Sequence, residues 1–261
     1  MRPSSTPDGP APWFERPDPA LLRTPAAGGA GGAASAGPPV WPDEPEAREF
    51  RTALRLQLVA DDALDPAQGF RAGEAFAPGV RAVFALASPD GAEYVPDGLL
   101  ERHGGAAALR TPALHNTLTR ERSDACLAIR SDPDDNLPLG AFFQLTGRSH
   151  FVASLALDLV RCAREVGIQP GPDGLLFALP SRNLLLMHAI RDATCQDSMN
   201  ALAMRAIRAH QRAPGAVTPN AFWWHDGRIE VISRYIDGRQ VWSVPDELVG
   251  ILTGHRRSER R

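Results

Sequence analysis

The segment between Gly174 and Ile232 limits the fold of this chain more than any other segment. Two apolar runs, GLLFAL and LLLMHAI, flank the turn residues PSRN, an amphipathic helical pattern follows, and the run TPNAFWWHDGRIEVI comes last. Short apolar runs around turn residues are typical of β-hairpins, whereas apolar residues three and four positions apart are typical of helices. The segment therefore predicts a hairpin, a helix and a second hairpin, which is an α+β arrangement.

The pair Asp226-Gly227 is the strongest hairpin signal, because both residue types accept the positive φ of a two-residue turn. Such a turn sets His225 opposite Arg228, and the alternation of side chains along a strand then defines two faces. The expected core face holds Phe222, Trp224, Ile229 and Val231, and the opposite face holds Trp223, His225, Arg228 and Glu230. A second pair, Asp237-Gly238, extends the meander to the run VWSV.

Two long amphipathic helices are expected to pack against these hairpins. The first begins at Ser149 and ends at Gly167, and the second begins at Thr194, with Asp197 in its first turn. The apolar stripe of the first contains Phe151, Leu155, Leu159 and Val166, and that of the second contains Met199, Leu202, Ala203, Ala206 and Ile207. The stripes predict that each helix buries one face.

The remaining elements follow from the same rules. The run EPEAREFRTALRLQLVADDA predicts a helix, because Phe50, Leu54 and Leu58 are four residues apart. VRAVFALASPDGAEYV predicts a hairpin, PDGLLERHGG a short helix, and Thr111 with Pro112 the start of another helix. ACLAIRS and GAFFQLT predict antiparallel strands around the turn-rich run DPDDNLP, and Pro245 starts a final short helix.

Composition divides the chain into three parts. Residues 1–44 are rich in Pro, Gly and Ala, and we expect a disordered leader there because little apolar surface can be buried. Residues 45–254 are expected to form the globular α+β body, either as one domain or as two lobes, 45–147 and 148–254. Residues 255–261 are expected to be a frayed basic tail.

Charge and cysteine content narrow the class of protein. With 31 acidic and 28 basic residues and a net charge of -3, the chain has no excess of positive charge to attract nucleic acid or an anionic membrane. The three cysteines are Cys126, Cys162 and Cys195. Their wide spacing predicts neither a disulfide framework nor a zinc ribbon. No signal peptide or membrane span is recognised, so we expect a cytoplasmic protein with no cofactor and no metal.

Five stretches, taken together, carry a family resemblance. They are ALASPDGAEYVPDGLLERHG, ALHNTL, SHFVASLALDLV, GLLFALPSRNLLLMH and TPNAFWWHDGRIEVI. They resemble the YtpQ-like family, a bacterial family of unknown function, over roughly residues 80–235. The resemblance implies a fold and no catalytic residue. The chain departs from the family at His103-Gly104, where relatives have Trp-Gly, and at Pro112, which interrupts a stretch expected to be continuous helix.

The sequence holds no metalloprotease, P-loop, nucleophile-elbow or Rossmann motif. The sharpest enzymatic hypothesis uses Cys195, because the start of a helix lowers the pKa of a thiol. His188 or His225 would then be its base. The alternative is that Cys195 fills a small gap against the sheet.

A partner surface is the other hypothesis for a site. Arg182, in the turn between two strands, would suit a carboxylate or a phosphate, although Pro180 and Asn183 beside it are also ordinary turn residues. The strip of Trp223, His225, Arg228 and Glu230 would suit a protein partner, although a solvated face or a face covered by a helix has the same pattern.

These observations favour a non-catalytic protein-interaction module, with an adaptor, chaperone-like or toxin-neutralising role and a protein partner. One alternative is an unrecognised hydrolase or thiol enzyme that uses Cys195 with a nearby histidine. Another is a small-molecule sensor with an apolar pocket between helices and sheet.

Overall fold

The structure is a computed structural model that describes residues 45–65, 67, 69–88, 91–121, 126–130, 141–192 and 194–259, with the backbone alone for 126–130 and 256–259. The described residues belong to one compact unit. The expected disordered leader, the DPDDNLP turn and the last two residues of the expected tail lie outside them. No helix among the described residues is long and apolar enough to cross a membrane.

A four-stranded antiparallel sheet occupies the first half of the described chain. Its strands are β1 (Leu54–Ala60), β2 (Glu74–Ala77), β3 (Val80–Ser88) and β4 (Gly91–Tyr94). β3 pairs with each of the other three, and β1 has no second neighbour among the described strands. The helices of this half are α1 (Pro45–Ala53), α2 (Asp97–Arg102) and α3 (Ala106–Arg120).

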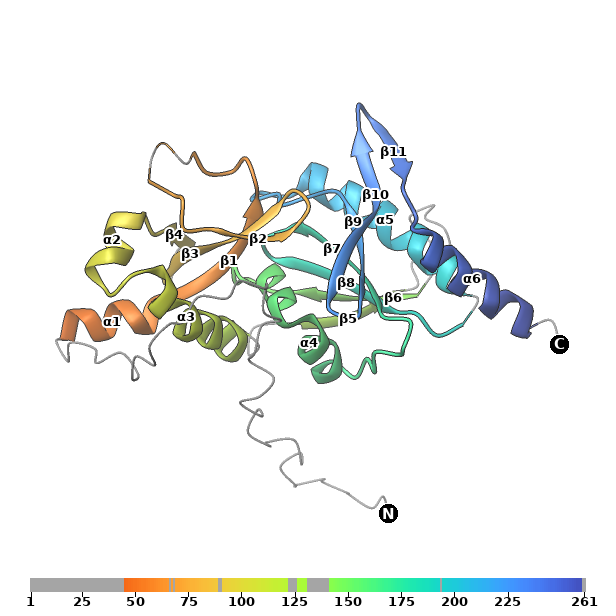
Figure 1. Cartoon of the computed structure of the whole chain (residues 1–261), viewed down its shortest axis with the longest axis horizontal. Coiled ribbons are helices and arrows are strands. Elements are labelled where there is room, and N and C mark those ends of the chain that lie inside the picture. The colour runs from red at the N-terminus through yellow and green to blue at the C-terminus, as the bar shows by residue number, and fades with distance from the viewer. Residues whose placement is uncertain are drawn as a thin grey trace, which may run out of the picture. The chain divides into compact units, whose positions relative to one another are not determined.

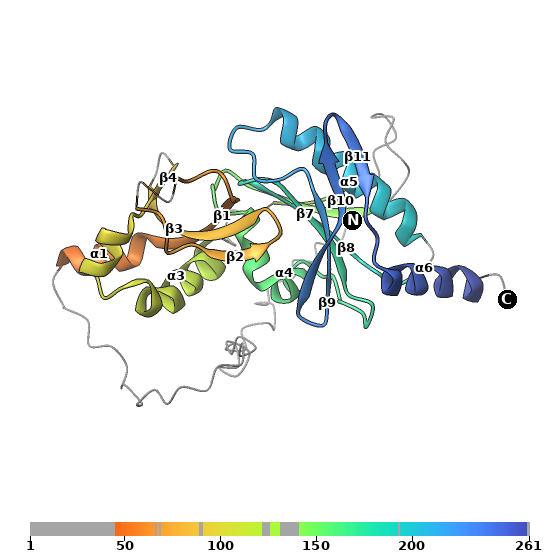
Figure 2. The ribbon, with the colours of Figure 1, turned by 45° about the horizontal axis from the view of Figure 1, so that its top comes forward.

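A seven-stranded antiparallel sheet occupies the second half, in the order β11-β10-β9-β7-β8-β6-β5. Its strands are β5 (Cys126–Arg130), β6 (Phe142–Thr146), β7 (Leu175–Ser181), β8 (Leu184–Ala189), β9 (Ala221–His225), β10 (Arg228–Ile236) and β11 (Arg239–Trp242). Its helices are the 3-10 helix η4 (Ala153–Asp158), α4 (Leu159–Glu165), α5 (Cys195–Arg212) and α6 (Asp246–Glu259). Figures 1 and 2 show α4 between the two sheets, with α5 and α6 on the far side of the larger one.

The central strands β7 and β8 of the larger sheet are buried on both faces. On one face, Phe177 and Phe222 stack with ring centroids 5.2 Å apart and belong to a core shared with η4, α4 and the smaller sheet. On the other face, Leu176 and Trp223 belong to a core shared with α5 and α6. An antiparallel sheet commonly keeps one face in water, and the centre of this sheet does not.

The hairpin predictions are confirmed. Asp226 and Asp237 have φ angles of 47° and 49°, and each is followed by a glycine with positive φ, as two-residue turns require. His225 pairs with Arg228 as expected. The long helix α5 is confirmed as well, and its predicted stripe from Met199 to Ile207 is buried. The α+β class therefore follows from the sequence.

The predicted helix over EPEAREFRTALRLQLVADDA is wrong in its second half. α1 ends at Ala53, and the chain continues as β1, which pairs with β3 over its whole length. Leu54 and Leu58 are four residues apart, but with Leu56 between them they also fit the period of two that a strand requires. Pairing with β3 outweighs the local helical pattern.

The prediction of the first long helix is also wrong. Between Ser149 and Gly167 the chain forms the 3-10 helix η4 and the short helix α4. Asp158 separates them, because its carboxylate accepts a hydrogen bond from the Arg161 backbone N–H at 3.2 Å and begins a new helix. The predicted apolar residues Phe151, Leu155 and Leu159 are nevertheless buried.

Two helix boundaries differ from the prediction. α3 begins at Ala106, before the predicted start at Thr111, and contains Pro112 in its interior. α6 continues to Glu259, so its last turns include residues that we expected to fray. The His255 imidazole anchors this end of α6 by a hydrogen bond of 2.7 Å between its Nε2 atom and a carboxylate oxygen of Asp173.

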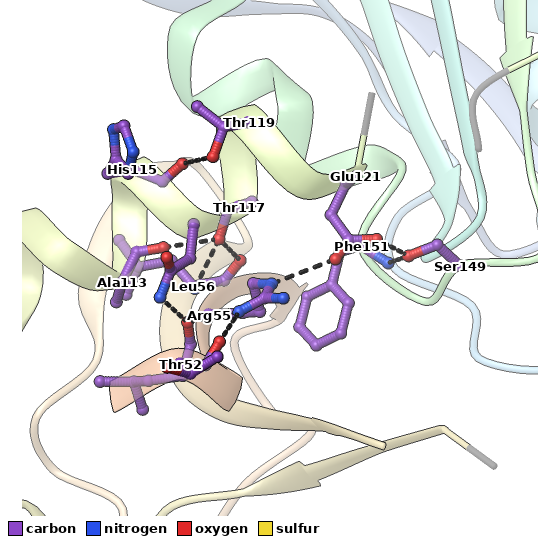
Figure 3. Close-up of polar contacts among 12 residues, drawn as sticks. Thr52, Arg55, Leu56, Ala113, His115, Thr117, Thr119, Glu121, Ser149 and Phe151 are labelled. Atoms are coloured by element: carbon purple, nitrogen blue, oxygen red, sulfur yellow. Dashed lines mark hydrogen bonds and ion pairs between the residues drawn. The ribbon is translucent and has the colours of Figure 1, made fainter. Parts of the chain in front are cut away.

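The outer edge of β1 is hydrogen-bonded by side chains instead of by another strand. The Leu56 N–H donates to the Thr117 hydroxyl at 2.8 Å, and the Leu58 N–H donates to the Ser154 hydroxyl at 2.9 Å. The Asn116 side-chain amide donates to the Leu54 carbonyl at 3.0 Å. Figure 3 shows Thr117 of α3 beside Leu56. An unpaired strand edge inside a protein would leave polar backbone groups unsatisfied, and these side chains prevent that.

The substitution Thr117→Val is expected to lower the free energy of unfolding by about 1–3 kcal/mol. Valine keeps the shape of the threonine side chain but leaves the buried Leu56 N–H without an acceptor. Urea unfolding measures the change. The matched control is Thr119→Val on the same helix, since Thr119 is exposed and bonds only to the carbonyl of His115. Equal destabilisation by the two variants would contradict a special role for Thr117.

Candidate functional site

The thiol of Cys195 is not activated by the helix that it begins. Cys195 is fully buried, and burial raises the pKa of its thiol from 9.0 to about 12, with further increases from the carboxylates of Asp192 and Asp173. Burial and two negative charges therefore outweigh the favourable field of the helix start. The Thr194 side chain does not cap the helix either, because its hydroxyl bonds to Asp192. Burial of Cys195 in the core between α5 and the sheet fits the alternative, in which this side chain fills a gap.

The two histidines proposed as the base of Cys195 lie in different surroundings. His188, on β8, is partly buried, and burial lowers the pKa of its imidazole, so it is neutral at pH 7. His225, on β9, stacks on Trp223 with ring centroids 4.8 Å apart and lies 3.6 Å from a carboxylate oxygen of Glu247 on α6. Among the described residues, no hydrogen bond joins either imidazole to Cys195. The described residues therefore do not form the thiol–imidazole pair that the enzymatic hypothesis requires.

Trp223 cannot belong to a partner surface. Its side chain is 1% exposed, and its indole N–H donates to the Asp173 carbonyl at 2.9 Å. The sequence left open whether a helix covers this face, and α5 and α6 do cover it. Arg228 and Glu230 are exposed, whereas His225 is half-buried under α6. The predicted polar strip is therefore divided between core and solvent.

The backbone of Arg182 is hydrogen-bonded on both sides. Its backbone N–H donates to the Gly215 carbonyl at 3.0 Å, and its carbonyl accepts a hydrogen bond from Ala153 at 3.1 Å. The stem of the side chain lies on Gly215, where any β-carbon would come within 2.6 Å of it. Within the described part of the chain, no carboxylate pairs with its guanidinium. The turn thus holds an arginine in place without neutralising it.

Tyr94 and His150 share the electrostatic field of Arg182. Burial lowers the pKa of His150, and the positive charge of Arg182 lowers it further. Burial also raises the pKa of Tyr94, although Arg182 opposes that change. At neutral pH the tyrosine is therefore a hydroxyl and the histidine is uncharged, so both can donate a hydrogen bond.

A second exposed feature is the β10–β11 hairpin, whose tip lies beyond the other strands of its sheet (Figure 1). Its register places Ile236 opposite Arg239 and Arg234 opposite Val241. These four residues share one face, because paired residues point to the same side of a sheet. Ile236 is 48% and Val241 46% exposed. We call these four residues the hairpin face.

The opposite side of the same hairpin is attached to the body. The Tyr235 hydroxyl accepts a hydrogen bond from the Gln211 amide of α5 at 2.9 Å. Gln240 donates to the Ser233 hydroxyl at 3.0 Å across the two strands. The hairpin is therefore fixed from one side, and the hairpin face is directed away from α5.

Comparison with protein-family models, with curated proteins and with solved structures gave no match. The resemblance to the YtpQ-like family therefore stays a prediction. No group of three or more His, Cys, Asp or Glu side chains in the described ranges is arranged to hold a metal ion.

The sequence pointed to Arg182 but not to the groups that its charge affects. His150 and Tyr94 have no motif spacing to Arg182, and only tertiary packing brings them within the range of that charge. The sequence does contain a signal for the hairpin face, because Ile236 and Val241 alternate with polar residues next to an Asp-Gly turn. Which of its faces stays exposed depends on α5 and could not be read from that alternation.

The raised pKa of Cys195 makes stability depend on pH in the alkaline range. Above pH 9.0 the Cys195 thiol loses its proton in the unfolded chain but keeps it in the folded one, because its folded pKa is about 12. The free energy of unfolding is therefore expected to fall by about 1.4 kcal/mol per pH unit in that window, in addition to other titrations.

Urea unfolding of the wild type and of Cys195→Ala, at about pH 8 and about pH 10, isolates this contribution, since other groups titrate in both proteins. The wild type should lose more stability than the variant does. The same pH dependence in both proteins would show that the thiol ionises in the folded state.

Proposed function

We propose that this protein is a non-catalytic interaction module that binds a protein partner through the hairpin face. The observation that carries the proposal is the pairing of two exposed aliphatic side chains, Ile236 and Val241, with two exposed arginines on one side of a fixed hairpin. Contiguous apolar surface with a charged rim is typical of protein-binding sites. An adaptor, a chaperone-like protein and a toxin-neutralising protein all need such a surface.

The charges of the hairpin face indicate the chemistry of the partner. Arg234 and Arg239 are exposed, and neither forms an ion pair with a described residue. A partner segment that carries carboxylates next to apolar side chains would satisfy both the arginines and the aliphatic pair. We therefore propose that the partner presents an acidic, partly apolar segment to the hairpin face.

The edge position of β11 supports an extended conformation for that segment. β11 ends the sheet order, so its outer backbone groups have no partner among the described strands. A peptide that adds a strand to such an edge gains main-chain hydrogen bonds, while its alternate side chains contact one face of the hairpin. Trp242, at the end of β11, is 37% exposed and would be covered from the edge.

The first step of the test identifies the partner. A photo-reactive amino acid at position 241, and in a second protein at position 249, is cross-linked in the cells that make the protein. Val249 is the matched control, because it is 47% exposed but lies on α6. A protein that cross-links from position 241 and not from 249 is then purified for binding measurements.

The binding measurement decides the proposal. Val241→Asp is expected to weaken binding of the purified partner by about tenfold or more, because it removes apolar contact and repels carboxylates. Val249→Asp should leave the affinity unchanged. Arg234→Glu should weaken binding relative to the wild type, and the effect should be larger at low salt. Equal affinities of the two aspartate variants, or cross-links only to a second copy of this chain, would overturn the proposal.

A further inference from the structure

α6 covers the side of β9 that carries Trp223. Leu248, Ile251 and Leu252 form one stripe of α6 and pack in the core that contains the indole. Leu248 is fully buried, whereas its neighbour Val249 is 47% exposed. The helix is therefore amphipathic and packs on the body along this stripe.

Two histidine–carboxylate contacts fasten α6 to the body. In its first turn, the Glu247 carboxylate lies 3.6 Å from the Nδ1 atom of His225. About 12 Å further along the helix axis, the Nε2 atom of His255 lies 2.7 Å from a carboxylate oxygen of Asp173. Both contacts lead to Trp223, because the His225 ring stacks on the indole and the indole N–H donates to the Asp173 carbonyl at 2.9 Å. The attachment of α6 and the burial of Trp223 therefore depend on the same residues.

The helix itself is intrinsically weak. α6 has 14 residues, and an isolated helix of that length is marginal in water. Gly250 and Gly254 lie inside it, where each glycine lowers the helical population about fivefold relative to alanine. A β-carbon at either position would have no packing neighbour within 4 Å, so packing does not require glycine there. α6 therefore depends on its contacts with the body to stay helical.

The strand beneath α6 does not need the helix for its own hydrogen bonds. β9 pairs with β7 on one side and with β10 on the other. The Ser243 N–H donates to the Ile232 carbonyl at 3.0 Å, which fixes the chain just before α6. Asp226 lies 3.9 Å from the second ring nitrogen of His225, on the same hairpin, and stays there when Glu247 leaves. α6 can therefore leave while the sheet stays paired.

We propose that α6 is a releasable cover, which detaches from β9 and unwinds as one unit, exposing Trp223 while both sheets stay folded. Its weak helix, its two polar fasteners and the complete pairing of β9 support this role. Segments that open in this way have a lower local stability than the core strands. The cover is independent of the proposed partner, because it involves none of the four residues of the hairpin face.

Hydrogen exchange of the whole protein, followed by NMR at low urea concentrations, tests the release. The amides of Val249 and Leu252 and the indole N–H of Trp223 should exchange through one common opening, at least about tenfold faster than amides in the middle of β7. Their exchange should also depend less on urea, because a local opening exposes less surface than global unfolding does.

Three results of that experiment would overturn the cover. α6 amides that exchange as slowly as those of β7 would show that the helix leaves only when the protein unfolds. Exchange that becomes steadily faster from Val249 toward His255 would show fraying of a helix end. An indole N–H that exchanges only with β7 would show that loss of α6 does not expose Trp223.

The glycines provide a second test with a matched control. Gly250→Ala should slow the exchange of α6 and of the Trp223 indole about fivefold, because alanine stabilises the attached helix. Gly98→Ala places the same change in α2, where a β-carbon also has open space, and should leave both rates unchanged. Equal effects of the two substitutions, or none from Gly250→Ala, would contradict the proposal.

The fasteners provide a third test. His255→Ala should speed the exchange of α6 and of the Trp223 indole about tenfold, because it removes the hydrogen bond to Asp173. Glu247→Gln should speed both rates about threefold, and more than Asp246→Asn, which removes an exposed carboxylate from the same turn. Circular dichroism checks that each variant is folded. Unchanged exchange in folded His255→Ala would overturn the proposal.

Discussion

The outer edge of β1 is the place where the two halves of this protein are joined. Thr117 and Asn116 reach this edge from α3, and Ser154 reaches it from η4, so helices that cover different sheets bond to one strand. The side chain of Leu58, on the same strand, belongs to the core of the larger sheet, whereas that of Leu56 belongs to the core of the smaller one. The strand is thus both an edge and a connector.

A buried ion pair lies at the same edge. Arg55 of β1 bonds to Glu121 at 3.1 Å, and both side chains are less than a tenth exposed. Glu121 also accepts a hydrogen bond from Ser149, and Arg55 donates to the backbone of Thr52 and Leu54 (Figure 3). Burial lowers the pKa of Arg55, but the bond to Glu121 opposes that change. Such a pair adds little net stability, and its geometry fixes where α3 ends relative to β1.

The packing explains which residues remain for function. α5 and α6 cover one face of the larger sheet, and η4 and α4 cover the other. Trp223 and Cys195 are therefore buried in the core. The hairpin face and the turn that carries Arg182 lie outside these cores.

Local signals in the sequence predicted the hairpins and α5. The Asp-Gly pairs indicate two-residue turns, and the stripe of Met199, Leu202 and Ile207 indicates a helix. β1 was missed because Leu54 and Leu58 are four residues apart, which also fits a helix, and only pairing with β3 decides between the two. The burial of Trp223 depends on α6, which is far along the chain. Arg182 could be predicted from its turn, whereas the hydrogen bonds of its backbone to Gly215 and Ala153 could not, because tertiary packing alone makes them.

Hydrogen exchange of the Leu56 and Leu58 amides tests the central claim that side chains complete the edge of β1. Both amides point away from β3 and are bonded to hydroxyls of Thr117 and Ser154. We predict that they exchange as slowly as amides in the middle of β7, because opening them requires α3 and η4 to separate from the strand. Exchange as fast as that of the outer amides of β11 would show that the edge is open and would contradict this account.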